Sequence, residues 1–213
     1  MIHALRRRHL TLMLKQASLM LVCLLSACAS APPPRWLSLP LPPDLAAPAV
    51  APLHANLPVL VVRRIGLPEY LQTNKVRYRL SGSVLGEWPG LLWAERLETG
   101  MTDHMIMRLR TALPGWTVCD RLCPPGMPKA TLGLDLVPLD YLRDVGQLHA
   151  NAHWDIALRN TGGGTANSTL SGAQAYALPV QADGGEGQAA AIGQLLDLLS
   201  EDIAKGLRAS DTH

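Results

Sequence analysis

Nine prolines occupy the 31 residues from Cys28 to Pro58, and this density limits where the folded part of the chain can begin. Proline lacks a backbone N–H and has a fixed φ angle, so such a segment forms neither a helix nor a central strand. We expect an extended spacer over residues 28–56, which at ~3.1 Å per residue reaches on the order of 90 Å. A single domain is then expected over residues 57–213.

Residues 1–27 have the pattern of a signal peptide. Four basic residues up to Lys15 precede the apolar run Leu19–Leu25, which is far shorter than the ~20 residues of a transmembrane helix. The sequence Leu25-Ser26-Ala27-Cys28 resembles the bacterial lipoprotein signal. This resemblance implies cleavage before Cys28 and acylation of Cys28 by membrane lipid. Because no Asp occupies the second mature position, it favours the inner leaflet of the outer membrane, facing the periplasm. An ordinary secreted protein, or an uncleaved anchor with an unmodified Cys28, is the alternative.

The charge of the mature chain argues against a nucleic-acid partner. Cleavage removes four basic residues and no acidic ones, which changes the formal net charge from +2 to −2. A nucleic-acid-binding protein needs an excess of Lys and Arg to neutralise phosphates. Hydrophobic residues make up 48% of the chain, so it can fill a packed core and does not resemble a disordered protein.

Hydrophobic patterns predict an α+β fold. Continuous apolar runs indicate buried strands, alternation indicates half-exposed strands, and spacings of three and four residues indicate helices. The expected strands are 58–62, 75–80, 83–88, 116–118, 131–136, 148–158 and 168–178, and the expected helices are 92–113 and 188–208. Strands joined by short loops pair antiparallel. We therefore predict a mainly antiparallel sheet packed against two amphipathic helices.

Polar residues on one predicted strand do not form a metal or catalytic site. Because side chains repeat every second residue, His149, His153 and Asp155 lie on one face of the strand over 148–158. The two histidines are about 13 Å apart in an extended strand, too far to share one zinc ion. His153 and Asp155 need a third ligand from elsewhere, and no nucleophile motif accompanies them. We expect no metal, no cofactor and no catalytic residue, and hence a protein that is not an enzyme.

Cys119 and Cys123 are expected to form a disulfide, because an exported protein reaches an oxidising compartment. A zinc site would need two further ligands at suitable spacing, and none follows. The run Gly162–Gly164 is not followed by Lys-Ser or Lys-Thr, so it predicts a flexible hairpin tip and not a phosphate-binding loop.

Three stretches, taken with the order of elements, resemble the ABC-type transport auxiliary lipoprotein family, the group of paraquat-inducible protein C. They are Leu67-Pro68-Glu69-Tyr70-Leu71, Trp93-Ala94-Glu95-Arg96-Leu97 and the final Leu/Ile-striped helix. In the second stretch the chain has Leu92 and Arg96 where family members commonly have Arg and Pro. The resemblance implies a non-enzymatic periplasmic component of a lipid transport system that maintains envelope integrity. Its implied partners are a mammalian-cell-entry (MCE) domain protein and ABC transporter subunits, and it implies a homo-oligomer.

We expect Tyr70, Trp93 and Glu95 to contribute to a partner or oligomer surface near the junction of sheet and first helix. The alternative is that Tyr70 and Trp93 are core residues and that Glu95 favours the start of the helix through the helix dipole. A different function is a lipoprotein that binds lipid, or assists outer-membrane assembly, on its own.

Overall fold

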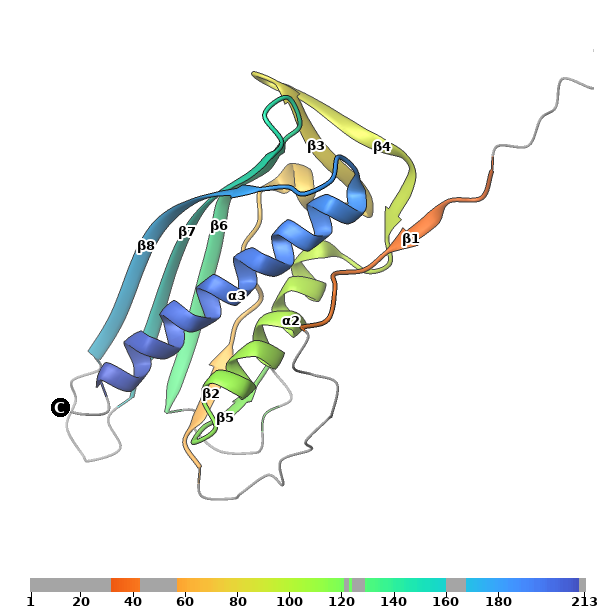
Figure 1. Ribbon diagram of the computed structural model, residues 1–213. Coiled ribbons are helices and arrows are strands. Elements are labelled where there is room, and N and C mark those ends of the chain that lie inside the picture. The colour runs from red at the N-terminus through yellow and green to blue at the C-terminus, as the bar shows by residue number, and fades with distance from the viewer. Residues whose placement is uncertain (1–31, 43–56, 121–122, 124–128, 160–167, 211–213) are drawn as a thin grey trace, which may run out of the picture. The chain divides into compact units, whose positions relative to one another are not determined.

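The computed structural model describes residues 32–42, 57–120, 123, 129–159 and 168–210, and Pro34–His213 forms one compact unit (Figure 1). Its strands are β1 (Arg35–Leu37), β2 (Val59–Val62), β3 (Lys75–Ser81), β4 (Val84–Trp93), β5 (Thr117–Cys119), β6 (Ala130–Leu142), β7 (Gln147–Leu158) and β8 (Ser168–Pro179). Its long helices are α2 (Leu97–Ala112) and α3 (Gly185–Ser210), and a 3-10 turn spans Glu69–Leu71. Cys28, the predicted signal peptide and Gly162–Gly164 lie outside the described residues. No helix in the described ranges is both long and apolar enough to cross a membrane.

The described strands form one mixed sheet, which corrects the prediction of a mainly antiparallel one. β6 pairs antiparallel with β7, and β7 with β8, along almost their whole lengths. On its other side β6 pairs parallel with β2 and, near its end, with β3. β2 and β5 are also parallel, as are β1 and β4, whereas β3 and β4 form the expected antiparallel hairpin.

The parallel pairing of β2 with β5 is possible because helix α2 lies between them in the chain. A strand that follows a crossover helix can return beside an earlier strand in the same direction. β5 returns in this way beside β2, whose continuous Val-Leu-Val-Val run suits a strand between two parallel neighbours. The predicted α+β class and the two helices are confirmed.

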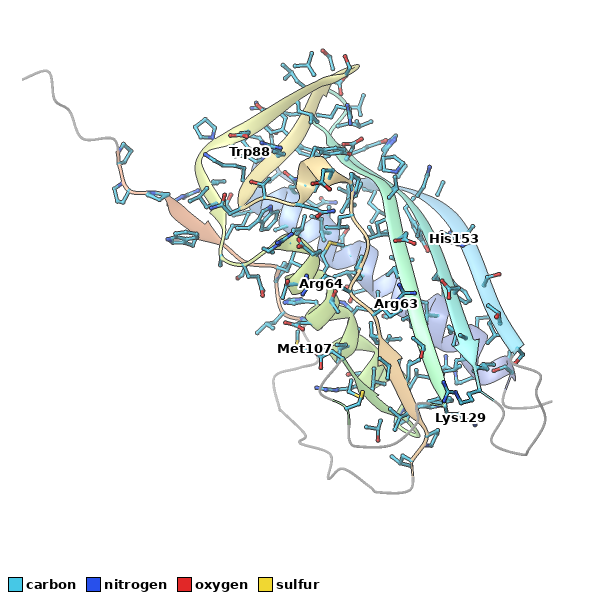
Figure 2. The ribbon with its side chains drawn as sticks, turned by 180° about the vertical axis from the view of Figure 1, so that it is seen from behind. Arg63, Arg64, Trp88, Met107, Lys129 and His153 are labelled. Atoms are coloured by element: carbon cyan, nitrogen blue, oxygen red, sulfur yellow. A yellow bond between two sulfur atoms is a disulfide. The ribbon has the colours of Figure 1, made fainter. Side chains whose placement is uncertain are left out.

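Helices α2 and α3 cover one face of the sheet, and no described helix covers the other face (Figures 1 and 2). The core lies between the two layers. The predicted apolar stripe of α3 is confirmed, since each of its members is at most 1% exposed: Ile192, Leu195, Leu196, Leu199, Ile203 and Leu207. Alternate residues of β6 and β7 face this stripe, among them Leu132, Leu136, Leu148 and Ile156.

Helix α2 begins at Leu97, later than the predicted start at residue 92. Leu92 and Trp93 instead continue β4, where they pair with β1. The Trp93 N–H donates to the Asn74 carbonyl oxygen at 2.7 Å. These backbone bonds hold residues 92 and 93 in a strand. The sequence did not reveal this, because the residues that follow have helical spacing and the predicted helix was extended back to residue 92.

Part of the proline-rich segment is docked on the domain. β1 pairs with β4, and the Arg35 guanidinium lies 2.9 Å from the Glu186 carboxylate at the start of α3. Leu39 is only 6% exposed, and Pro40 lies against Gly193 of α3. The expected spacer over 28–56 therefore does not hold for residues 35–40, and the folded domain begins before residue 57. The strand is compatible with nearby prolines because β1 lies at an edge of the sheet.

Candidate interaction surfaces

The predicted surface of Tyr70, Trp93 and Glu95 is not present as one exposed patch. Trp93 is 3% exposed and belongs to the hydrophobic core, so it cannot touch a partner while the domain is folded. Its prediction as a partner contact is wrong, and the alternative of a core residue is right. Glu95 is exposed just before α2, where partial burial of its carboxyl and then the charge of Asp103 raise its pKa.

Tyr70 is half-buried and is held in a polar network on the open side of the sheet. Its hydroxyl donates to Asp140 Oδ1 at 2.8 Å. Arg79 donates from Nε and Nη2 to the two oxygens of the same carboxylate, and its guanidinium lies 5.7 Å from the Tyr70 ring centre. Burial, followed by the bond to Asp140, raises the pKa of Tyr70 to about 12. The network therefore fixes the 3-10 turn to β3 and β6 and leaves the Tyr70 hydroxyl already bonded.

A second network joins the β3–β4 hairpin to the start of α3. Arg143 lies 4.5 Å from the centre of the Trp88 ring and 5.1 Å from that of Tyr78. Its guanidinium also donates to both carboxylate oxygens of Asp183, and these bonds are the main reason that the pKa of Asp183 lies below its usual value. Trp88 Nε1 donates to the side-chain oxygen of Gln188 at 3.0 Å. Together these contacts hold the base of the hairpin firmly on the domain.

Four exposed apolar residues lie where this hairpin and the neighbouring β6–β7 turn end, and we call them the hairpin tip: Leu80, Val84, Leu85 and Val145. Each is between 38% and 56% exposed. The β6–β7 turn that carries Val145 lies beside the end of β3, because the Arg143 N–H donates to the Arg79 carbonyl oxygen (Figure 1). Exposed apolar groups that gather on a rigid projection are typical of contact sites.

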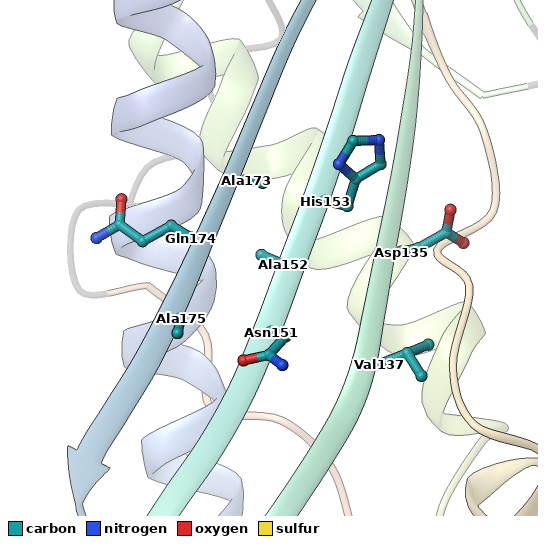
Figure 3. A pocket seen from close by; sticks show the side chains of 8 residues that line it. All are labelled: Asp135, Val137, Asn151, Ala152, His153, Ala173, Gln174 and Ala175. Atoms are coloured by element: carbon teal, nitrogen blue, oxygen red, sulfur yellow. The ribbon is translucent and has the colours of Figure 1, made fainter.

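The uncovered face of β6, β7 and β8 carries small and polar side chains around a shallow hollow of about 420 Å³ (Figure 3). Asp135 on β6 lies opposite His153 on β7, a pairing that the spacing along one strand could not reveal. His149 and Asp155 lie on the same face. In the described part of the chain no three His, Cys, Asp or Glu residues come together as metal ligands would.

Cys119 and Cys123 are joined by a disulfide, with their Cα atoms 5.4 Å apart. The bond lies at the end of β5, at the margin of the sheet. A bonded pair offers neither a thiolate nucleophile nor a metal ligand.

A family model described as an ABC-type transport auxiliary lipoprotein component matches residues 39–204. The chain belongs to this family. The match begins at Leu39, inside the docked part of the proline-rich segment, which agrees with a domain that starts before residue 57. The sequence resemblance to ABC-type transport auxiliary lipoproteins is thus confirmed.

Two solved structures share the fold of this auxiliary lipoprotein. A crystal structure of an uncharacterized protein has a TM-score of 0.64 at 21% identity, over 83% of this chain and 99% of that chain. The crystal structure of a Xanthomonas campestris protein of the DUF330 family has a TM-score of 0.56 at 13% identity, over 84% of this chain and 100% of that chain. No match was found among curated proteins.

The sequence did not point to the hairpin tip of this auxiliary lipoprotein, although one signal was present. Leu80 and Val84 flank Ser81-Gly82-Ser83, and apolar residues beside so short a polar turn are exposed unless another segment covers them. Val145 joins them only because β3 and β6 end side by side. The tip offers apolar contact area and no reacting group, so it suits non-covalent binding.

Proposed function

We propose that this protein is a non-enzymatic adaptor of a lipid transport system, anchored by acylated Cys28 to the inner leaflet of the outer membrane and facing the periplasm. It attaches an MCE-domain protein and ABC transporter subunits to that membrane, works as a homo-oligomer and so maintains envelope integrity. The observation that carries this proposal is the match of residues 39–204 to the transport auxiliary lipoprotein family.

The docked segment limits how far the domain lies from the anchor. Because β1 begins at Arg35, seven peptide units separate it from Cys28. A fully extended chain of that length spans at most about 25 Å, well below the reach of a spacer that extends to residue 56. In this proposal the adaptor therefore works close to the membrane. Two or three acyl chains suffice for durable attachment, since each buried methylene contributes about 0.8 kcal/mol.

The hairpin tip is the surface that we assign to the transport partner. Its base is fixed by the Arg143 network, so little conformational entropy is lost when a partner covers it. Burying apolar area contributes about 25 cal/mol per Å², and anchoring both proteins in the envelope raises their effective concentration.

Affinity purification of the full chain from detergent-solubilised envelope tests this assignment. We expect an MCE-domain or ABC subunit to copurify with the native chain and to be lost with Leu80→Ser/Val84→Ser. The matched control is Leu198→Ser, which changes a similarly exposed leucine on α3. Copurified lipid without a protein partner would instead favour the stand-alone lipid-binding function. Equal recovery of the partner with the tip variant and with the control would refute the tip as the contact.

The anchor is tested separately by Cys28→Ser. Without the thiol no diacylglyceryl thioether can form, so the variant should leave the membrane fraction, and mass spectrometry of the native chain should find a lipid-modified Cys28. An unmodified Cys28 in a chain that still fractionates with membranes would contradict lipid anchoring.

A further inference from the structure

Strand β8 is an edge of the sheet without the usual protection. No described strand pairs with its outer side. Its residues Ser168–Pro179 include no charged side chain, and its ladder with β7 runs without a bulge from Ser168 to Pro179. Natural edge strands normally carry a lysine, an internal proline, a bulge or a cover, because bare edges pair with other strands.

The register identifies the backbone groups that face outward. Val180 N–H donates to the Gly146 carbonyl oxygen at 2.8 Å, which marks these two residues as a hydrogen-bonded pair. Hydrogen-bonded and non-hydrogen-bonded pairs alternate along an antiparallel ladder. The N–H and C=O groups directed away from β7 are therefore those of every second residue, namely Thr169, Ser171, Ala173, Ala175 and Ala177. All five residues are exposed, and their side chains are too small to hinder the approach of a second strand. Figure 3 shows two of them, Ala173 and Ala175.

We propose that β8 of a second copy of this chain pairs antiparallel with β8 about a two-fold axis at Ala173. This register places Thr169 opposite Ala177 of the second copy and Ser171 opposite Ala175 of the second copy. It pairs all five outward residues and forms about ten backbone hydrogen bonds. An isologous contact of this kind joins two sheets into one and brings no charged side chains of the two strands together.

The helix-side face of the edge fits the same register. Gly172 would lie opposite Gln174 of the second copy. Gly172 borders a hollow of about 390 Å³ whose lining includes Trp154, Lys205, Gly206 and the same chain's own Gln174 and Asp202. A Cβ atom at position 172 would collide with the Trp154 ring, so the glycine leaves the space that the indole fills. The Gln174 side chain of the second copy can therefore enter the hollow above the indole.

Charge on α3 also favours a second copy as the occupant. Asp202 accepts a hydrogen bond from Tyr176, and Lys205 has no ion pair among the residues that the structure describes. In the proposed register Gln174 of the second copy lies opposite Gly172. Tyr176 of the second copy follows two residues later, about 7 Å further along that strand. Lys205 thereby approaches Asp202 of the second copy, and the two-fold axis repeats this pair. The proposal names a contact for the homo-oligomer and in that respect rests on the proposed function, but it does not depend on the transport partner.

Cysteine cross-linking in envelopes tests the axis with the full chain. Ala173→Cys places two thiols across a hydrogen-bonded pair, whose Cα separation of about 5.5 Å is within disulfide range. Ala157→Cys is the matched control, because Ala157 is exposed on the same face but lies on β7. Under mild oxidation we expect at least about tenfold more disulfide-linked dimer from Ala173→Cys than from the control. Equal yields, or a cross-link from residue 173 to a different protein, would overturn the proposal.

Charge substitution tests the same contact in detergent solution by light scattering. Ala173→Lys and Ala173→Glu should each separate the β8-paired copies, because like charges meet at the axis. The particle mass measured for either variant should then be half that of the native protein. A mixture of the two variants should restore it, since Lys then faces Glu. The variants are at an exposed position, and circular dichroism verifies that they fold. A native mass unchanged by either variant would refute β8 pairing, whatever the outcome of the partner purification.

Discussion

Replacing Leu39 by Ala should destabilise the domain measurably, although this residue lies in a proline-rich segment that resembles a spacer. Leu39 is 6% exposed, and its neighbour Pro40 packs against α3. Buried Leu→Ala substitutions cost about 2 to 5 kcal/mol. We expect the lower end, about 2 kcal/mol, because the segment is at a sheet edge and can move to fill the space.

Leu41 supplies the matched control, because it is two residues away and 69% exposed. Leu41→Ala should change the free energy of unfolding by less than about 0.5 kcal/mol. Urea unfolding followed by circular dichroism measures both values, provided that the slope m is unchanged between variants. In thermal unfolding, Leu39→Ala should lower Tm by about 4 to 8 °C.

Equal stability of the two variants would refute the docking of residues 35–40. The domain would then begin near residue 57 as the proline content suggests, and the limit on its distance from the membrane would no longer apply. A loss confined to Leu39→Ala supports both the docking and that limit.

Three further predictions concern the interior and its polar networks. Trp93→Ala should cost about 3 to 5 kcal/mol in urea unfolding, and a change near zero would instead support Trp93 as a surface contact. Tyr70→Phe removes the donor to Asp140 and should cost about 1 kcal/mol; an unchanged Tm would show that this bond contributes nothing. Burial, and then the charge of Arg108, lower the pKa of His104 in the folded state. Because the unfolded chain then binds more protons, stability should be full above about pH 6.5 and fall as the pH decreases below it. His104→Gln should flatten this dependence between pH 7.5 and 5, and a native stability that does not change with pH would contradict the reasoning.

Local patterns predicted most of the helices and strands, but neither β1 nor the start of α2 at Leu97. The Leu/Ile stripe of α3 and the alternation along β7 follow from the periods of 3.6 and 2 residues, which depend only on neighbours in the chain. The spacing of His149 and His153 likewise argues against a shared zinc ion, because the rise per residue of a strand fixes their separation whatever surrounds it. Cys28 stays a prediction of the sequence, because it lies outside the described residues.

Partners across the fold could not be read in the same way. Proline content described the segment around Leu39 correctly as non-helical, but whether it docks depends on β4 and α3, which come later in the chain. The same holds for Trp93, which a helical spacing assigned to α2 and the pairing with β1 retains in β4. The sequence by itself predicted most of the helices and strands and the family to which the chain belongs, and the signal peptide stays a prediction. Only the tertiary structure decided that the sheet is mixed, that no described strand pairs with the outer side of β8, and that the β6–β7 turn lies beside the β3–β4 hairpin. These features arise from contacts between residues far apart in the chain. The spacing of hydrophobic residues along one segment does not show which distant segment it will contact.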